Sequence, residues 1–160
     1  MAKVKVTNEL IYLSRQLKEA EARITELTGS KKPGAVATEV LQLDYLKNRG
    51  FKNYYLDDNC ALAGVDAVSE TQPSLQLKNT EGEKSSYTGG KSSPMHLIAE
   101  KAVKCDENAY LVFTRMKAGV VVDCVVGFAE DLLDWRTSSG KGVQTANFTT
   151  LVRDFNFERI

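Results

Sequence analysis

The feature that most constrains this sequence is an apolar stripe near its N-terminus, which recurs in alternating steps of four and three residues. The stripe consists of Val6, Leu10, Leu13, Leu17, Ala20, Ile24 and Leu27. This spacing is a heptad repeat, in which Leu10, Leu17 and Ile24 take position a and the other four residues take position d. Because most of the residues between them are polar or charged, the segment predicts an amphipathic helix.

Signals at both ends place this helix at about Asn8 to Thr28. Thr7 can cap the first turn, Glu9 puts a negative charge where the helix dipole favours it, and Gly29 suits the left-handed position after the last turn. A helix of this length is marginal alone in water, so the stripe must be covered. A second copy, the chain's own globular part or a different protein could cover it. The flanking e and g positions offer no ladder of opposite charges that would select among them.

The sequence predicts a short linker after this helix, followed by one globular domain. Breakers and polar residues cluster in Gly29-Ser30-Lys31-Lys32-Pro33-Gly34. With 160 residues the chain has the length of one domain with an appendage. The predicted organisation is therefore a coiled-coil type helix over residues 1–29, a linker over 30–35 and a globular domain over 36–160.

Local patterns divide the first part of this domain into alternating elements. The expected order is a helix from Val36 to Asn48, a strand from Phe51 to Leu56, a helix starting after Asp57-Asp58-Asn59, a strand from Ser74 to Lys78 and a mobile polar loop from Asn79 to Ser92. A further helix should begin at Ser93 and Pro94, because serine can cap and proline suits the first helical position.

Two apolar strands and a C-terminal segment complete the prediction. The strands are Ala109 to Met116 and Val120 to Phe128, joined by a three-residue hairpin loop across Lys117-Ala118-Gly119. Both are apolar at nearly every position, so both faces should be covered. A short helical turn from Ala129, a polar loop and an extended segment from Phe148 to Phe157 should follow. The fold class is α+β with a central antiparallel hairpin, and a ferredoxin-like sandwich is one arrangement that this order allows.

Composition excludes several classes of function. The 21 basic and 21 acidic residues give a net charge of zero, which argues against duplex nucleic acid as a partner. No apolar run approaches the roughly 20 residues that span a bilayer, and the first residues lack the apolar core of a secretory signal. The three cysteines have no motif spacing, so reduced thiols and a cytoplasmic location are expected.

No catalytic, metal or cofactor site emerges from the sequence. Cys60 and His96 could form a thiol–imidazole pair, but a core cysteine and a surface or boundary histidine explain both residues better. The carboxylates show no spacing that demands shared acid and base roles. A single histidine also leaves no first-row metal site built from imidazoles.

One segment supports an alternative function as a small enzyme or binding protein for a phosphate-bearing or nucleotide-like metabolite. Gly89, Gly90, Lys91, Ser92 and Ser93 lead into a predicted helix, and such a loop can present backbone N–H groups and a lysine to an anion. The segment lacks the glycine spacing and the preceding buried strand of a Walker A motif. A flexible loop that ends in an ordinary capped helix explains it better.

Asp123 is the one carboxylate predicted to lie inside the domain, because valines surround it on the second hairpin strand. A buried carboxylate needs a partner. Arg115 on the neighbouring strand lies close by on the diagonal, so an internal ion pair is expected rather than a catalytic aspartate.

Aromatic residues could stack on single-stranded bases, but their sequence context favours the core. They are Phe51, Tyr54, Tyr55, Tyr87, Tyr110 and Phe113. Base-stacking sites interleave aromatic side chains with Arg and Lys, and here only Lys52 lies among the first group. Core packing is therefore the prediction.

The last ten residues alternate Phe155 and Phe157 with polar neighbours, a pattern that can add a strand to the sheet edge of a neighbouring molecule. We therefore predict a non-enzymatic structural or interaction subunit, without cofactor, that self-associates or docks in a larger assembly. Its size and lack of motifs would suit a phage-encoded component. The predicted contact residues are Leu10, Leu13, Leu17, Ile24, Leu27, Phe155 and Phe157.

Overall fold

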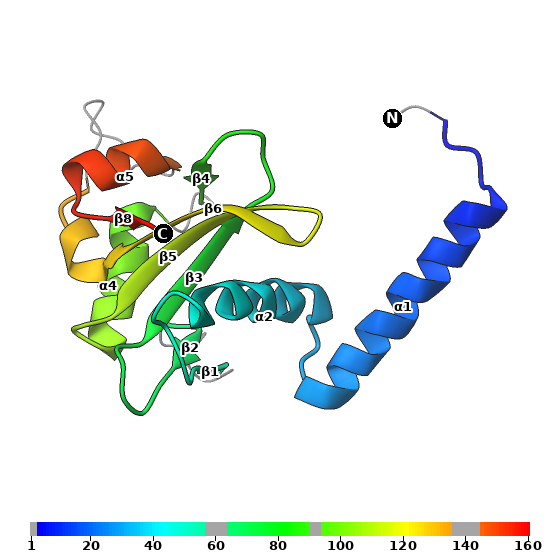
Figure 1. Ribbon diagram of the computed structural model, residues 1–160, viewed down its shortest axis with the longest axis horizontal. Helices are drawn as coiled ribbons and strands as arrows, with labels where there is room; N and C mark the ends of the chain where they lie inside the picture. Colours follow the sequence, from blue (N-terminus) through cyan, green and yellow to red (C-terminus); the bar gives the residue numbers. More distant parts are fainter. Residues whose placement is uncertain (1–2, 57–63, 90–93, 136–144) are drawn as a thin grey trace. The chain divides into compact units, whose positions relative to one another are not determined.

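The computed structural model describes residues 3–56, 64–89, 94–135 and 145–160. The chain divides into two compact units, Met1–Thr38 and Glu39–Ile160. The boundary falls inside the second helix, and each unit is described by itself. Figure 1 shows the order of the helices and strands along the chain.

The first unit is dominated by the predicted helix, α1, which spans Asn8–Thr28. The side chain of Thr7 accepts a hydrogen bond from the backbone N–H of Leu10 at 3.2 Å. At the other end Gly29 takes the left-handed conformation with φ of 72°, and its N–H bonds to the carbonyl of Thr25 at 2.7 Å. Both predicted caps and both predicted ends of α1 are thus confirmed.

The second helix, α2, spans Pro33–Lys47 and begins earlier than expected. The sequence placed Pro33 and Gly34 in a linker that ran to residue 35. Proline fits the first turn of a helix, where its missing N–H leaves no bond unmade, so the helix starts at that residue. The connection between the helices is correspondingly short.

The second unit is built on a six-stranded sheet in the order β1-β2-β3-β5-β6-β8. Its strands are β1 (Tyr55–Leu56), β2 (Ala67–Val68), β3 (Leu75–Thr80), β5 (Tyr110–Lys117), β6 (Val120–Phe128) and β8 (Glu158–Arg159). Strands β3 and β5 run parallel, and every other pair is antiparallel. This architecture confirms the α+β class with a central antiparallel hairpin, while this order does not show a ferredoxin-like topology.

Strand β5 lies at the centre and is buried on both faces. Its Leu111 and Phe113 belong to one core cluster with helix α4 (Met95–Cys105), the 3-10 helix η1 (Ala129–Leu132) and helix α5 (Phe148–Asp154). Val112, between them, belongs to the opposite cluster with Leu46 of α2. The alternation of side chains along a strand produces this division, and it confirms the predicted two-sided burial of β5.

Strand β6 is covered only in its second half. Residues 124–127 are buried, whereas Val120 and Val122 retain 62% and 46% of their surface. The hairpin extends beyond the neighbouring β8, which pairs only with Val125 and Val126. The prediction that both faces of the whole strand are covered is therefore wrong for its first residues.

The hairpin turn also differs from the prediction. Ala118 and Gly119 both have positive φ, at 50° and 79°, and together form a two-residue connection between β5 and β6. Positive φ at both central residues matches the right-handed twist of the strands. The register shift lies within the ladder instead, between Arg115 and Met116.

The sequence predicted an extended segment from Phe148 to Phe157. The first part of this segment instead forms helix α5. The side chain of Asn147 caps this helix by accepting hydrogen bonds from the N–H groups of Thr149 and Thr150, at 2.9 and 3.3 Å. This cap and the burial of Phe148 and Leu151 outweigh the strand preference of the β-branched residues. Only Glu158–Arg159 are strand, paired with β6 of the same chain.

Four further predictions changed or lie outside the described residues. The loop predicted for residues 79–92 contains β4 (Ser86–Thr88), which pairs with β7 (Thr145–Asn147) in a small second sheet. Only Tyr55–Leu56 of the strand expected at 51–56 is strand. Helix α4 starts at Met95 with Pro94 as its N-cap rather than its first helical residue, and the expected cap Ser93 lies outside the described residues. The helix expected after Asn59 also falls on residues that the structure does not describe.

A close approach between β6 and the C-terminal segment gives the first testable prediction. A Cβ at Gly127 would overlap the ring of Phe157, which is 3% exposed and held in the core. Gly127→Ala should therefore lower the free energy of unfolding by about 1–3 kcal/mol, the usual cost of overpacking. Chemical denaturation measures this difference. Gly82→Ala is the matched control, because its nearest neighbour, Thr80 Oγ1, would be 3.5 Å away, and an equal loss in both variants would contradict the account.

Candidate functional site

The first candidate surface is the apolar stripe of α1. None of the residues of this helix is buried. Leu10, Leu13, Leu17 and Leu27 expose 39%, 53%, 57% and 67% of their surface, and Ile24 is half-buried. Isolated exposed leucines are ordinary, but a continuous row along one helix face marks an interaction site.

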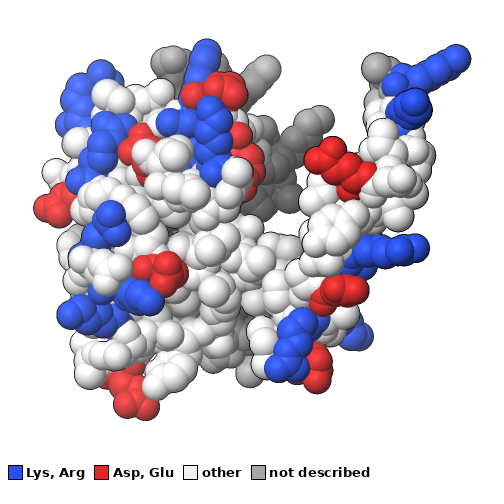
Figure 2. All heavy atoms as spheres, turned by 45° about the vertical axis from the view of Figure 1, so that its right-hand side comes forward, with Lys and Arg blue, Asp and Glu red and all other residues white. Residues whose placement is uncertain are grey.

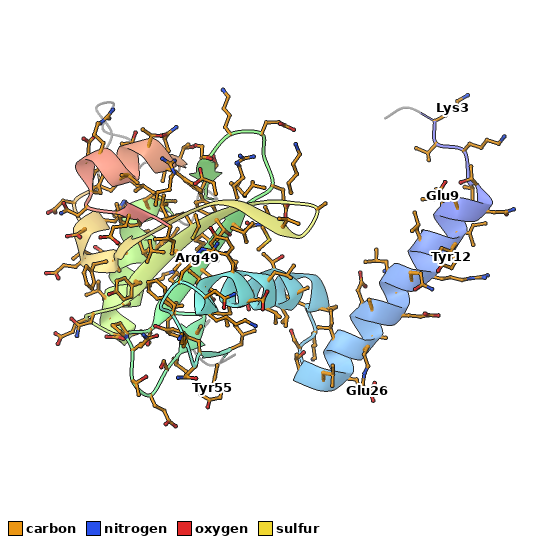
Figure 3. All side chains as sticks on the ribbon, viewed as in Figure 1. Lys3, Glu9, Tyr12, Glu26, Arg49 and Tyr55 are labelled. Carbon is orange, nitrogen blue, oxygen red and sulfur yellow. The ribbon has the colours of Figure 1, made fainter. Side chains whose placement is uncertain are left out.

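One further apolar side chain, Ile11, widens this surface near its N-terminal end. Ile11 is 39% exposed and, with Val6 and Leu10, lines an open apolar depression of about 550 Å³ on the first unit. Tyr12, labelled in Figure 3, is 61% exposed but belongs to position c, away from the stripe. The apolar surface is therefore broader in the first half of α1 than in the second.

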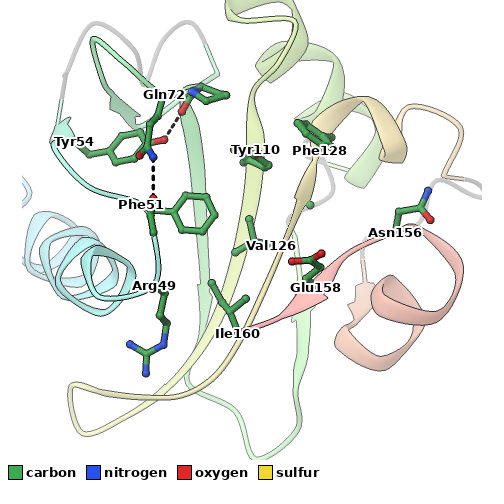
Figure 4. A pocket seen from close by; sticks show the side chains of 13 residues that line it. Arg49, Phe51, Tyr54, Gln72, Tyr110, Val126, Phe128, Asn156, Glu158 and Ile160 are labelled. Carbon is green, nitrogen blue, oxygen red and sulfur yellow. Dashed lines mark hydrogen bonds between the residues drawn. The ribbon is translucent and has the colours of Figure 1, made fainter.

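The second candidate is a pocket of about 390 Å³ in the second unit. Figure 4 shows the ring of Phe51 beside the sheet surface formed by Tyr110, Val126 and Phe128. The rings of Tyr110 and Phe128 stack with centroids 4.6 Å apart, and Phe51 meets Tyr110 edge-on at 5.5 Å. This floor could accept a planar or apolar group.

Polar side chains around this pocket are engaged within the protein. The hydroxyl of Tyr54 donates to the carbonyl of Pro73 at 2.5 Å, and burial, then nearby Tyr110 and Asp106, raise the pKa of Tyr54 above its usual range. The amide of Gln72 donates to the carbonyl of Gly50 at 2.8 Å and accepts from the N–H of Lys52 at 3.1 Å. The guanidinium of Arg49 lies over the ring of Tyr45 at 3.5 Å. These groups maintain the shape of the pocket rather than define a particular ligand.

The third candidate is a polar cluster around Asp123. Arg159 of β8 contacts both carboxylate oxygens of Asp123, at 3.0 and 3.3 Å, and the hydroxyl of Ser85 donates to the same group. Ser85 Oγ in turn accepts from Nε of Arg115 at 3.2 Å. The predicted internal ion pair exists, but its cation is Arg159. Arg115, directly opposite Asp123 in the ladder, reaches the serine instead.

The pKa of Asp123 reflects these contacts. Burial alone would raise the pKa, but the hydrogen bonds from Ser85 and Arg159 and the positive charge of Arg159 outweigh it and hold the pKa below its usual value. Asp123 is therefore ionised near neutral pH. Asp123 of β6 is held by Arg159 of β8 and by Ser85, so this ionised carboxylate joins β6, β8 and the loop that contains Ser85.

The structure tests only part of the remaining chemistry. Gly89 is buried, whereas residues 90–93 of the predicted anion loop and Cys60 lie outside the described residues, so the anion loop stays a prediction.

His96 is half-buried on α4, and its buried Nδ1 finds no hydrogen-bond partner among the described residues. Cys124 is buried, and burial followed by the charge of Asp123 raises the pKa of its thiol to about 12. That thiol is protonated and unreactive near neutral pH.

The predicted C-terminal contact residues are already used within the chain. Phe157 is 3% exposed in the core cluster, and Phe155 packs partly buried with its ring 4.4 Å from that of Trp135. Their expected role in contacts with another molecule is therefore corrected: both stabilise their own domain. The predicted contact surface reduces to the stripe of α1.

The aromatic residues divide among the core, the pocket and the surface, and the core prediction is wrong for Tyr55, which is 62% exposed. Tyr87 and Phe113 pack in the core as predicted, with ring centroids 5.5 Å apart. Phe51 and Tyr110, which the sequence also assigned to the core, line the pocket together with Phe128, which is 44% exposed. The register that places Tyr110 opposite Phe128 was the signal that could have located this surface.

Within the described ranges, no group of three or more histidine, cysteine, aspartate or glutamate side chains could hold a metal ion. No described helix is both long and apolar enough to cross a bilayer. On the face of the molecule in Figure 2, basic and acidic side chains are interspersed rather than gathered by sign.

Comparison with known proteins assigns no family. No model of a protein family matches this sequence, and no curated protein matches it significantly.

The Asp123 cluster gives a prediction with a defined pH dependence. Asp123→Ala should lower the free energy of unfolding at pH 7 by about 1–2 kcal/mol, the lower part of the range for charged hydrogen bonds because solvent partly screens the pair. Its folded pKa lies below the unfolded value of about 3.9, so this contribution is present above pH 4 and is lost as the pH falls through the folded pKa. Thermal unfolding of both proteins from pH 7 to pH 2.5 measures the difference.

The control for this prediction is Asp154→Ala. Asp154 pairs with the adjacent Arg153 at 2.9 Å on the surface, and removing an exposed pair should leave the unfolding curve unchanged. A difference between Asp123→Ala and the unmodified protein that stayed constant down to pH 2.5 would contradict an electrostatic origin.

Proposed function

We propose that this protein is a non-enzymatic structural or interaction subunit that self-associates through α1. The supporting observation is the stripe of large apolar side chains along a capped 21-residue helix, none of whose residues is buried. Each large side chain contributes about 1.5–3 kcal/mol when it is fully removed from water. A partner helix can cover the whole row at once, which isolated loops or small ligands cannot do.

The second unit supports this role because its core is formed by its own residues. It contains two core clusters, one on each face of the sheet, and its C-terminal segment pairs with β6 of the same chain. A domain with such a core does not require the stripe of α1 to cover it. The lack of motif spacing among the three cysteines favours a cytoplasmic setting for such an assembly.

The proposal predicts that one charge placed within the stripe abolishes association. Leu17→Glu would bury an unpaired carboxylate in the contact, so the variant should sediment as a monomer of 17.7 kDa at concentrations where the unmodified protein is larger. Sedimentation equilibrium over a wide concentration range provides the masses, and circular dichroism shows whether the variant remains folded.

Tyr12→Glu is the matched control, because it adds the same charge to the same helix outside the stripe. It should associate like the unmodified protein. The proposal is wrong if the unmodified chain is a monomer at high concentration, or if Leu17→Glu associates as strongly as Tyr12→Glu.

A further inference from the structure

The two halves of α1 carry opposite charge. Residues 8–18 have a balance of +1, from Arg15 and Lys18 against Glu9. Residues 19–28 have a balance of −2, from Glu19, Glu21 and Glu26 against Arg23. The helix is thus complementary in charge to its own reverse.

The sizes of the apolar side chains also distinguish a parallel from an antiparallel pair of helices. Ala20 is the one small residue in the stripe, and it lies one step from Leu17 near the middle of the helix. In a parallel, in-register pair, Ala20 would face Ala20 of the other copy and leave that layer underfilled. Such gaps are costly, because closely packed interfaces alternate large and small side chains.

An antiparallel pair removes this defect. When each a position faces a d position of the other copy, the register that overlaps the most residues places Leu17 against Ala20, Leu13 against Ile24 and Leu10 against Leu27. Each of these contacts then occurs twice around a two-fold axis between Leu17 and Ala20. Every layer from residue 10 to residue 27 contains at least one large side chain, and neither Ala20 faces another alanine.

We infer that α1 pairs with α1 of a second copy of this chain in an antiparallel arrangement. This inference rests on the proposed function and adds the direction and the register of the two helices. The same arrangement places the basic half of one helix along the acidic half of the other. A parallel arrangement places the two basic halves together.

Packing contributes more than charge to the preference for antiparallel over parallel pairing. The ion pairs along α1, Lys18 with Glu21 at 3.5 Å and Arg23 with Glu26 at 2.9 Å, are solvent-exposed, and salt screens such charges within about 8 Å at physiological ionic strength. The Leu17–Ala20 layers lie at the centre, away from salt. Charge complementarity therefore acts mainly on orientation and register.

The test measures distances between identical spin labels in the associated protein. Cys60→Ser and Cys105→Ser provide the background, and buried Cys124 is retained. Single labels are attached through Tyr12→Cys, Lys18→Cys or Thr25→Cys, all outside positions a and d. With a rise of about 1.5 Å per residue, the antiparallel register offsets the two labels along the axis by about 20 Å at positions 12 and 25, and by about 2 Å at position 18.

The expected result is the shortest distance at position 18 and longer, similar distances at positions 12 and 25, in labelled proteins whose mass equals that of the unmodified dimer. The background protein treated with the label should give no dipolar signal. Three similar distances in a dimer would show a parallel pair and overturn this inference, while leaving self-association intact. A monomeric unmodified protein would overturn both this inference and the proposed function.

Discussion

An apolar row on a helix of 21 residues must be removed from water for that helix to be stable. Thr7 and Gly29 fix where α1 begins and ends, but capping contributes only about 1 kcal/mol at each end. Caps therefore decide the ends of the helix, and packing of its apolar face decides whether it is populated. In the function we propose, the interaction that covers the stripe of α1 is also the interaction through which the protein associates.

The second unit buries its core with its own residues. Strand β5 sends Phe113 to one face and Val112 to the other, and each meets a separate buried cluster. At the edge, Arg159 and Asp123 join β8 to β6, while Phe157 fills the space above Gly127. Residues that the sequence assigned to contacts between molecules thus stabilise one domain. The pocket beside Tyr110 and Phe128 remains open, and its polar groups Tyr54 and Gln72 bond within the protein.

Local signals predicted those parts of the fold that local physics determines. The ends of α1 and the strongest hairpin follow from caps and from apolar periodicity, and both were located correctly. The start of α2 at Pro33 was not predicted, because proline and glycine usually break helices, although proline fits the first turn of a helix. Helix α5 was not predicted either, because its β-branched residues favour a strand and the burial of Phe148 and Leu151 overrode that preference. The partner of Asp123 was predicted as Arg115 rather than Arg159, since no short-range pattern reveals that residues 36 positions apart meet on adjacent strands. The pocket depends on the same kind of long-range pairing.

Amide hydrogen exchange at several protein concentrations tests the central claim most directly. If a second copy covers α1, the protection of residues 8–28 should increase with protein concentration, because only the associated state buries the stripe. Protection of β5, which is covered within its own domain, should stay constant and serves as the internal reference. Protection of residues 8–28 that is strong at every concentration would mean that the chain covers its own helix, and it would contradict the account.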